Sequence, residues 1–371
     1  MPRSLPGGSD SGSPARWADR LQGTVMTVGM KAMPRLPIGV QRLMTGGRSV
    51  TIDGNTLDPT LRLTLAAQHA MGINGFVVGD DATASRAQLR QTTAGLGGGD
   101  IHGCDVRDIV LPGPDGEIAA RHYRPAGGPD LEAKPLLVFY HGGGFVIGDL
   151  DSHDAICRLT CRDGDMAVLS VDYRLAPEHP APAALDDAYA AFRWAYEHAA
   201  ELGGIPGRVA VGGDSAGGNL AAAVALLARD SGGPAPVLQW LIYPVTDCTA
   251  QTRSRTLYGD GFLLTKHDID WFTAQYVGRS QLDPTDPRVS PLLAGDLSGL
   301  PPALVAVAGF DPLHDEGELF AAALRDSGVA VDLRQMPSLT HAFINLFPLG
   351  GGSATATSEL ISALRAHLSR G

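Results

Sequence analysis

The sequence predicts an α/β protein built on a mostly parallel, eight-stranded sheet with helices on both faces. Short apolar runs alternate with helical patterns along most of the chain, which is typical of strands joined by crossover helices. Several central runs are apolar throughout rather than at every second residue, and this pattern marks strands covered on both faces. A chain of 371 residues with 44% apolar and 19% charged residues can bury the core that such a fold needs.

Residues 1–100 precede this alternation of strand-like and helical patterns and show no strand-like runs of the same kind. Residues 1–16 are rich in Pro, Gly and Ser, so we expect them to be disordered. Residues 17–100 are expected to form an N-terminal helical cap. Its helical patterns cover residues 17–44, 58–69 and 82–93. The second begins at Asp58-Pro59, with proline at the favoured N1 position, and a glycine-rich linker over residues 95–100 follows the third.

The main domain is expected over residues 101–246 and 289–371. Its eight strand-like runs are Val106–Leu111, Ile118–Tyr123, Leu136–Tyr140, Ala167–Val171, Val209–Gly212, Leu238–Tyr243, Ala303–Ala308 and Ala330–Met336. Helical patterns occur at His153–Cys161, Leu185–Glu201, Ala216–Arg229, Glu316–Ser327 and Thr357–Leu368. Residues 247–288 interrupt the alternation and carry too many apolar side chains for a free loop. We interpret them as an inserted second part of the cap, which closes with the N-terminal helices.

Charge and cysteine content exclude several classes of function. A formal net charge of −11 without a dense basic patch argues against nucleic acid as a partner. The four cysteines are Cys104, Cys157, Cys161 and Cys248. Their spacing is not that of a metal site, so we expect reduced thiols, no bound metal and a cytoplasmic location.

The sequence also bears on membranes and on assembly. No secretory signal is evident, and Pro34 and Pro37 interrupt the apolar stretch over residues 23–40, so this stretch should not span a bilayer. The basic residues of the N-terminal segment permit weak contact with a membrane surface. An edge strand of the sheet could pair with its copy in a homodimer.

One turn between a strand and a helix is unusual. Residues 213–219 have the sequence GDSAGGN and join an apolar strand to a helix that is apolar on nearly all sides. Gly213 and Gly217 allow the two backbones to approach closely, with Ser215 at the apex of the turn. This arrangement predicts a nucleophile elbow, which exposes a serine oxygen above the sheet at a helix N-terminus. An ordinary glycine-rich loop is the alternative.

A serine becomes an effective nucleophile only with a base and a group that orients the base. Asp311 follows the seventh predicted strand and His341 follows the eighth, in the chain order of an α/β-hydrolase triad. We therefore predict that His341 removes the proton of Ser215 and that Asp311 holds the imidazole in the required tautomer. The competing candidates are Asp315, which starts a helix, and His314, which lies on the loop of the acid itself.

Acyl transfer also needs hydrogen-bond donors for the oxygen that becomes negative. Residues 141–145, with the sequence HGGGF, follow the third predicted strand, where such a loop belongs. We predict that the N–H groups of Gly142, Gly143 and Ala216 form the oxyanion hole. His141 is expected to brace the loop rather than to act as a base. A phosphate-binding loop is the competing interpretation, but no Walker-type or dinucleotide motif follows a strand here.

Four motifs support one another: HGGG at residues 141–144, YRLAPEHP at 173–180, GDSAGG at 213–218 and DPLHDE at 311–316. Together they resemble the hormone-sensitive lipase family of esterases, in its bacterial GDSAGG branch of the α/β-hydrolase superfamily. The resemblance implies an α/β-hydrolase fold with a two-part helical cap, and hydrolysis of carboxylic esters without a cofactor. The N-terminal region resembles the variable cap of that family more loosely and is longer than usual.

The sequence therefore predicts a serine carboxylesterase that acts on short- to medium-chain esters through an acyl-enzyme on Ser215. Five aromatic residues are candidates to line its pocket, although core packing explains each equally well: Phe145, Tyr243, Phe262, Phe310 and Phe343. An amidase or peptidase would use the same triad. A ligand-binding protein is the alternative of another class, because the resemblance includes plant hormone receptors that have lost the catalytic histidine, whereas His341 is present here.

Overall fold

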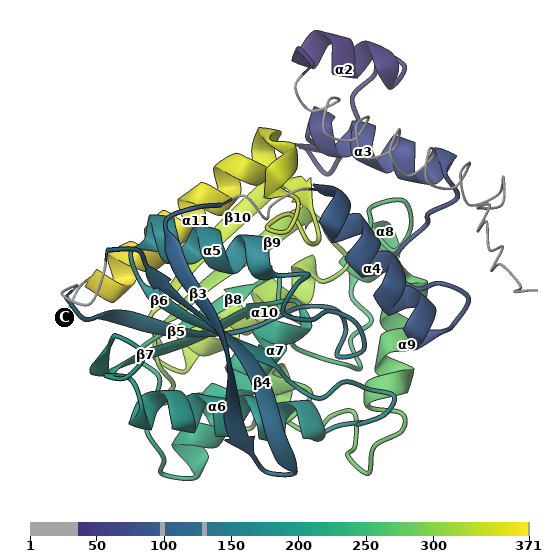
Figure 1. Cartoon of the computed structure of the whole chain (residues 1–371). Coiled ribbons are helices and arrows are strands. Elements are labelled where there is room, and N and C mark those ends of the chain that lie inside the picture. Colours follow the sequence, from purple (N-terminus) through teal and green to yellow (C-terminus); the bar gives the residue numbers. More distant parts are fainter. Residues whose placement is uncertain (1–35, 97–100, 128–131, 370–371) are drawn as a thin grey trace, which may run out of the picture.

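The computed structural model describes residues 36–96, 101–127 and 132–369 of the chain. The strands of its main sheet are β3 (Cys104–Gly113), β4 (Gly116–Pro125), β5 (Lys134–Tyr140), β6 (Ala167–Asp172), β7 (Gly204–Asp214), β8 (Gln239–Ile242), β9 (Ala303–Phe310) and β10 (Val331–Thr340). They are arranged in the order β10-β9-β8-β7-β5-β6-β4-β3 (Figure 1). β4 runs antiparallel to both of its neighbours, β3 and β6, and all other neighbours are parallel. The predicted eight-stranded, mostly parallel sheet is confirmed.

Helices cover both faces of this sheet. One face packs against α6 (Ala183–Glu197), α7 (Ala216–Asp230) and α10 (His314–Asp326). The other face packs against α5 (Asp154–Gly164) and α11 (Gly351–Ser369). Along β5, Leu136 and Val138 belong to the first core, whereas Leu137 and Phe139 belong to the second. Successive side chains of a strand point to opposite faces, so a strand that is apolar at every position supplies both cores.

The N-terminal described segment forms helices and a short hairpin: α2 (Ile38–Met44), β1 (Thr51–Ile52), β2 (Asn55–Thr56), α3 (Pro59–Ala70) and α4 (Ala82–Leu96). α3 begins as predicted, because the Asp58 carboxylate accepts hydrogen bonds from the N–H groups of Thr60 and Leu61. The same carboxylate accepts from Gly352 of α11, and the Asp58 N–H donates to Ser338 of β10. These contacts fix the start of α3 to the main domain.

Some predictions for this segment cannot be compared with the structure. Residues 1–16 and most of the helical pattern over 17–44 lie outside the described residues. The β1–β2 hairpin is a feature that the sequence analysis does not anticipate. The predicted division of the chain into cap and catalytic parts stays a prediction.

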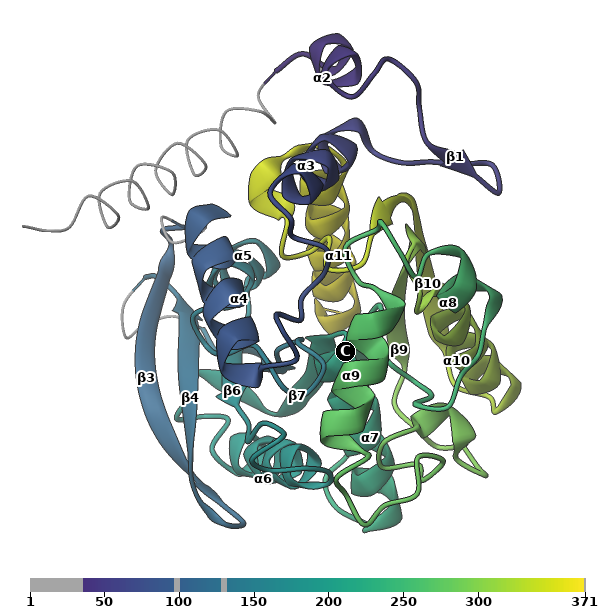
Figure 2. The same ribbon diagram turned by 90° about the vertical axis from the view of Figure 1, so that its right-hand side faces the viewer.

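The inserted segment contains α8 (Arg253–Leu257) and α9 (Lys266–Tyr276), and short 3₁₀ turns follow at Pro291–Leu293 and Phe347–Leu349. α4 and α9 stand at the same edge of the sheet (Figure 2). One buried carboxylate links the two segments: Asp268 Oδ1 accepts hydrogen bonds from the N–H groups of Phe76 at 3.1 Å and Val77 at 2.9 Å. Asp268 also forms a capping box with Thr265 at the start of α9. The N-terminal and inserted segments are therefore in direct contact.

Candidate active site

Ser215 occupies the turn between β7 and α7, where the sequence predicts a nucleophile elbow. Its φ of 57° and ψ of −116° are rare for a residue other than glycine. A Cβ on Gly217 would lie 1.8 Å from the carbonyl oxygen of Tyr140, and a Cβ on Gly213 would lie 2.3 Å from the same oxygen. The two glycines therefore let the turn and α7 pass close to the end of β5. Ser215 is the N-cap residue of α7, so the positive end of the helix dipole lies beside its side chain.

Ser215, His341 and Asp311 form one chain of hydrogen bonds. Ser215 Oγ lies 2.9 Å from His341 Nε2, and His341 Nδ1 lies 2.8 Å from Asp311 Oδ2. Asp311 Oδ1 accepts a further hydrogen bond from the Leu313 N–H at 2.8 Å, which fixes the carboxylate. Because Asp311 can only accept, Nδ1 carries the imidazole proton and Nε2 is free to accept the proton of Ser215. The structure thus brings together the three residues that the sequence analysis selects.

The two competing candidates lie elsewhere. The Asp315 carboxylate is in the first turn of α10 and accepts a hydrogen bond from the Ser254 N–H at 2.8 Å. His314 Nδ1 lies 3.0 Å from the carbonyl oxygen of Ala308. Among the described residues, neither side chain takes part in the hydrogen bonds that reach Ser215. Both serve the local structure of α10 instead.

The first glycine of the predicted oxyanion loop is held by the residue that precedes the nucleophile. The Gly142 N–H donates to Asp214 Oδ1 at 2.9 Å, and Asn345 Nδ2 donates to Asp214 Oδ2 at 3.0 Å. Burial raises the pKa of Asp214, but the nearby His153 and the hydrogen bonds to the carboxylate lower it more, so the net shift is downward. Asp214 is therefore a carboxylate that anchors the loop. The prediction that Gly142 is an oxyanion donor is wrong, because its N–H is already engaged.

The next two glycines remain candidate donors. The N–H groups of Gly143, Gly144 and Ala216 are paired with no acceptor among the described residues, and Gly143 and Gly144 line the pocket around Ser215. Gly143 has a φ of 120° and Gly144 a φ of 59°, values that glycine adopts readily. A Cβ on Gly144 would lie 2.2 Å from the ring of Phe272. Gly144 thus takes the place that the sequence analysis gave to Gly142.

His141 braces the loop from behind. Its ring stacks on Tyr173 with centroids 4.3 Å apart, and its Nδ1 lies 2.8 Å from the Gly142 carbonyl oxygen. The Tyr173 hydroxyl donates to the His141 carbonyl oxygen at 2.7 Å. Burial lowers the pKa of His141 to about 4, and a charge on His153 would lower it as well. His141 is therefore neutral at physiological pH.

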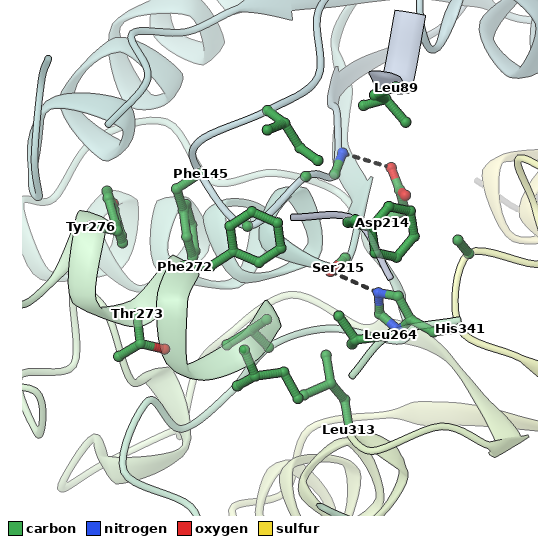
Figure 3. A pocket seen from close by; sticks show the side chains of 18 of the residues that line it. Leu89, Phe145, Asp214, Ser215, Leu264, Phe272, Thr273, Tyr276, Leu313 and His341 are labelled. Carbon is green, nitrogen blue, oxygen red and sulfur yellow. Dashed lines mark hydrogen bonds between the residues drawn. The ribbon is translucent and has the colours of Figure 1, made fainter. Parts of the chain in front are cut away.

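A pocket with about 770 Å³ of space, open to solvent, surrounds Ser215 and His341. Aromatic side chains form one of its walls, and the Phe145 ring stacks on Tyr276 with centroids 3.9 Å apart. Phe272 of α9 lies beside them, and Figure 3 shows Ser215 between His341 and this aromatic group. We call Phe145, Phe272 and Tyr276 the aromatic wall.

Four of the five predicted pocket aromatics pack in the core instead, and those predictions are wrong. Tyr243 lies behind His341 with ring centroids 4.6 Å apart, and Phe343 contacts Tyr243 edge-on at 5.2 Å. Phe262 and Phe310 pack together at 5.3 Å. None of the four lines the pocket around Ser215. Tyr243 and Phe343 pack behind His341, and Phe262 and Phe310 pack with Tyr258, so apolar burial rather than substrate contact determines these residue types.

The sequence analysis missed most of the apolar lining, which comes from both predicted cap segments. The residues concerned are Phe76, Leu89, Leu264, Ile269, Phe272 and Val277. The signal that could have found them is the apolar content of residues 262–277, which exceeds what a surface loop needs. A surface helix needs one apolar stripe for the core, and additional apolar positions indicate a second buried contact.

The described residues provide no group of three or more His, Cys, Asp or Glu side chains arranged to hold a metal ion. In the same part of the chain, no helix is both long enough and apolar enough to cross a bilayer. The four cysteines are free thiols, and Cys248 lines the pocket around Ser215. Burial raises the pKa of Cys248 to about 12, so its thiol is protonated at neutral pH and does not compete with Ser215 as a nucleophile.

Comparison with known proteins agrees with this geometry. Residues 137–345 match a protein family described by the alpha/beta hydrolase fold. Carboxylic ester hydrolase LipN of Mycobacterium tuberculosis is 64% identical, and the match covers 100% of both chains. Carboxylesterase NlhH of the same organism is 41% identical, over 86% of this chain and 98% of NlhH.

Solved structures of esterases share the fold. Ester hydrolase EH1AB1 from the metagenome of Lake Arreo, solved with a derivative of bipyridine phosphonate, matches with a TM-score of 0.80 at 39% identity over 84% of this chain and 99% of its own. The esterase of Pyrobaculum calidifontis matches with a TM-score of 0.77 at 40% identity, over 84% of this chain and 98% of its own. The chain therefore belongs to the alpha/beta hydrolase fold family, among its carboxylic ester hydrolases of the hormone-sensitive lipase type.

Proposed function

We propose that this carboxylic ester hydrolase is a serine esterase that acts on short- to medium-chain esters through an acyl-enzyme on Ser215. His341 is the base, and Asp311 orients it. The observation that carries the proposal is the pair of contacts from His341, 2.9 Å to Ser215 Oγ and 2.8 Å to Asp311 Oδ2. The similarity to carboxylic ester hydrolase LipN and carboxylesterase NlhH supports the same reaction.

Acylation begins when Ser215 Oγ attacks the carbonyl carbon of the ester and His341 Nε2 takes the serine proton. The carbonyl oxygen becomes an oxyanion and accepts hydrogen bonds from the N–H groups of Gly143, Gly144 and Ala216. Asp311 stabilises the positive charge on the imidazolium. When the tetrahedral intermediate collapses, the bond to the alcohol oxygen breaks and that oxygen takes the proton from His341. The alcohol leaves, and the acyl group remains on Ser215.

Deacylation repeats these steps with water as the nucleophile. His341 removes a proton from the water as it attacks the acyl carbon, and the same three N–H groups stabilise the second oxyanion. Collapse of this intermediate breaks the bond to Ser215 Oγ, which recovers its proton from His341. The products are a carboxylic acid and the free enzyme, so the complete cycle consumes one ester and one water.

The pocket supports an uncharged substrate with a chain of limited length. Its lining is mainly apolar, and each square ångström of apolar surface that a substrate buries there contributes about 25 cal/mol. The aromatic wall and Ile269 line this space, and we expect short and medium chains to fill it best.

The test is hydrolysis of p-nitrophenyl esters of acetate, butyrate, octanoate and palmitate by the whole chain. We expect kcat/KM to be highest among the first three esters and to fall for palmitate. A serine-reactive phosphonate should stop turnover and modify Ser215, as identified by peptide mass spectrometry. The Ser215→Ala variant is the control and should neither turn over nor be modified. Modification of a different residue that accompanies the loss of activity would reject Ser215 as the nucleophile.

A further inference from the structure

The helix α2 turns its polar side chain to the protein and its apolar side chains to solvent. Gln41 is the one buried residue of α2. Its Oε1 accepts a hydrogen bond from the Thr60 hydroxyl of α3 at 3.1 Å, and its Nε2 donates to the Leu36 carbonyl oxygen at 2.8 Å. A surface helix of a globular protein buries an apolar stripe instead. The attachment of α2 therefore leaves its apolar residues without a core.

Four side chains form what we call the apolar face of α2: Ile38, Val40, Leu43 and Met44. Their exposed fractions lie between 41% and 76%. Among the described residues, the other exposed large apolar side chains are scattered singly over the molecule, at Met71, Val110, Leu293 and Leu319. In both views α2 lies beyond α3, away from the main sheet (Figures 1 and 2). A group of exposed apolar side chains on one outlying helix indicates a surface for another molecule.

Positive charge gathers beside this apolar face. Arg42 of α2 and Arg48, which follows the helix, are exposed and form no ion pair with any described residue. The next two acidic residues of the chain are already engaged. Asp53 forms an ion pair with Arg253 at 2.5 Å, and the Asp58 carboxylate caps the start of α3. The two arginines are therefore available to an anionic partner.

The sequence carries the same imbalance of charge. Residues 1–50 contain seven Lys or Arg, two Asp and no Glu, whereas residues 51–371 contain 22 Lys or Arg and 38 Asp or Glu. The chain thus has a positive N-terminal segment on a body that is strongly negative. Such an asymmetry indicates either nucleic acid or an anionic membrane as the partner. The apolar face favours the membrane, because a bilayer offers an apolar interior and the phosphate backbone of a nucleic acid does not.

A second copy of the chain suits this surface less well than a bilayer does. Most homodimers are twofold symmetric, so the same patch would face itself and the arginines of the two copies would approach one another. Like charges that meet across an interface disfavour association. A bilayer with anionic lipids supplies both complements at once, namely negative headgroups for Arg42 and Arg48 and an apolar layer for the side chains of α2.

We propose that α2 docks this enzyme on the surface of a bilayer that contains anionic lipids. The apolar face enters the boundary between headgroups and acyl chains, and Arg42 and Arg48 contact the headgroup phosphates. No residue of α2 lines the pocket around Ser215, so docking leaves the catalytic machinery untouched. Phe76 and Leu89 of the same N-terminal segment do line that pocket. An enzyme held in this way works at an interface where apolar esters accumulate.

Flotation with lipid vesicles measures the docking of the whole chain. One set of vesicles contains equal parts of phosphatidylcholine and phosphatidylglycerol, and the other contains phosphatidylcholine alone. We expect the partition coefficient to be at least about tenfold higher for the anionic vesicles, because each arginine near an anionic surface adds to binding. Raising the NaCl concentration to about 0.5 M should lower this partition, since salt screens exposed charges.

The apolar face is tested by Leu43→Glu, which removes apolar surface and adds a negative charge. We expect this variant to lower the partition into anionic vesicles at least about tenfold. Leu319→Glu is the matched control, because Leu319 is an exposed leucine of α10 and the change in net charge is the same. The control should bind as the parent does.

The charges are tested by the double variant Arg42→Gln with Arg48→Gln. We expect it to lower the partition into anionic vesicles at least about tenfold. Arg193→Gln with Arg279→Gln is the matched control, because it also removes two exposed arginines but on other elements. All four variants should keep kcat/KM for p-nitrophenyl butyrate within about twofold of the parent, which shows that they are folded.

Three outcomes would overturn the proposal. The first is a parent that does not float with anionic vesicles, or that floats equally with both kinds. The second is a control variant that loses as much binding as its α2 counterpart. The third is a parent that light scattering shows to be a dimer and that Leu43→Glu converts to a monomer, because α2 would then be an interface between copies. The esterase mechanism would stand in each case, and a parent without ester turnover would leave the vesicle result unchanged.

Discussion

Ser215, the proposed nucleophile, has a backbone conformation that lowers stability. Its φ of 57° lies in the left-handed region, where a residue other than glycine is of order 1–3 kcal/mol less stable. Ser215→Ala keeps the strained positive φ, so we expect the free energy of unfolding to stay close to that of the parent. Ester turnover should fall to the about 10³–10⁴-fold acceleration over water that a site without its nucleophile retains. Initial rates with p-nitrophenyl butyrate and urea unfolding measure the two quantities.

Ser215→Gly completes this comparison. Glycine adopts a positive φ without steric conflict, which stabilises the folded state, but its greater backbone entropy stabilises the unfolded state. The first effect is the larger one, so this variant should be about 1 kcal/mol more stable than Ser215→Ala. An alanine variant that is as active as the parent would exclude Ser215 as the nucleophile. A glycine variant less stable than the alanine variant would show that the turn is not strained.

The orienting acid can be tested against its nearest competitor. In Asp311→Asn, the amide still reaches His341 but favours the wrong tautomer, and we expect kcat to fall by about 10⁴-fold, as a comparable change does in a serine protease. Asp315→Asn keeps a hydrogen-bond acceptor for the Ser254 N–H, so kcat should change less than about threefold. Steady-state kinetics with p-nitrophenyl butyrate provide the measurement. If Asp315→Asn were the more damaging change, Asp315 would be the orienting acid.

Which site residues could be predicted depends on how each one is placed. The proximity of Ser215, His341 and Asp311 could be predicted because Asp311 and His341 come directly after two parallel strands, whose carboxyl ends meet at one edge of the sheet. Phe310 was assigned to the pocket wrongly, because it is fully buried and packs against Tyr258 and Phe262 in the core. The three glycines of the oxyanion loop are equivalent in the sequence. Only the position of the Asp214 carboxylate shows that the first N–H is engaged.

Among the helices and their connections, the start of α9 is the point at which the two predicted cap segments meet. Asp268→Ala removes the acceptor of the Phe76 and Val77 N–H groups and the capping box with Thr265. Leaving buried donors unpaired costs about 1–3 kcal/mol each, so we expect the melting temperature to fall and ester turnover to fall with it. Hydrogen exchange should become faster at Phe76 and Val77.

The matched control is Asp270→Ala, on the same helix. Asp270 is exposed and pairs with Lys266 at the surface, so its loss should change the free energy of unfolding by less than about 0.5 kcal/mol. Equal destabilisation by the two substitutions would mean that helix propensity, rather than the link between the segments, explains the effect of Asp268→Ala.

The strands of the main domain could be predicted because a sheet that is covered by helices on both faces needs strands that are apolar at every position. β5 is an example, since Leu136 and Leu137 serve opposite cores and both positions must be apolar. The β1–β2 hairpin was missed, although its two-residue loop is Asp53-Gly54, both with positive φ, a dipeptide typical of a tight hairpin turn. The contact of the inserted segment with residues 76–77 could not be predicted. It depends on one carboxylate that lies nearly two hundred positions further along the chain.

For the molecule as a whole, buried charge makes stability depend on pH. Burial, with the nearby Asp149 as a further cause, raises the pKa of Asp172 to about 6, whereas an unfolded aspartate titrates near ~3.9. The native state therefore binds this proton more tightly than the unfolded state. The stability that this proton provides is fully present below about pH 4 and is lost as the pH rises through about 6. The loss amounts to about 2–3 kcal/mol.

Asp172→Asn keeps the shape of the protonated side chain and removes the charge. We expect it to raise the free energy of unfolding by about 2 kcal/mol at pH 8 and by less than about 0.5 kcal/mol at pH 4. Urea unfolding at the two pH values is the measurement. Asp105→Asn, at an exposed position of β3, should have little effect at either pH. A gain of equal size at pH 4 and pH 8 would contradict the charge-based explanation.

The Asp268 contact with Phe76 and Val77 joins positions 192 and 191 residues apart, and this separation has a consequence for biosynthesis. The first half of the contact leaves the ribosome long before its partner is made, so these amides bond to water while the sheet is still being assembled. His341 is translated later still. A nascent chain therefore carries Ser215 for some time without its proposed base and without an enclosed pocket. By the proposed mechanism, the growing polypeptide hydrolyses no ester until the segment that carries His341 has left the ribosome and folded.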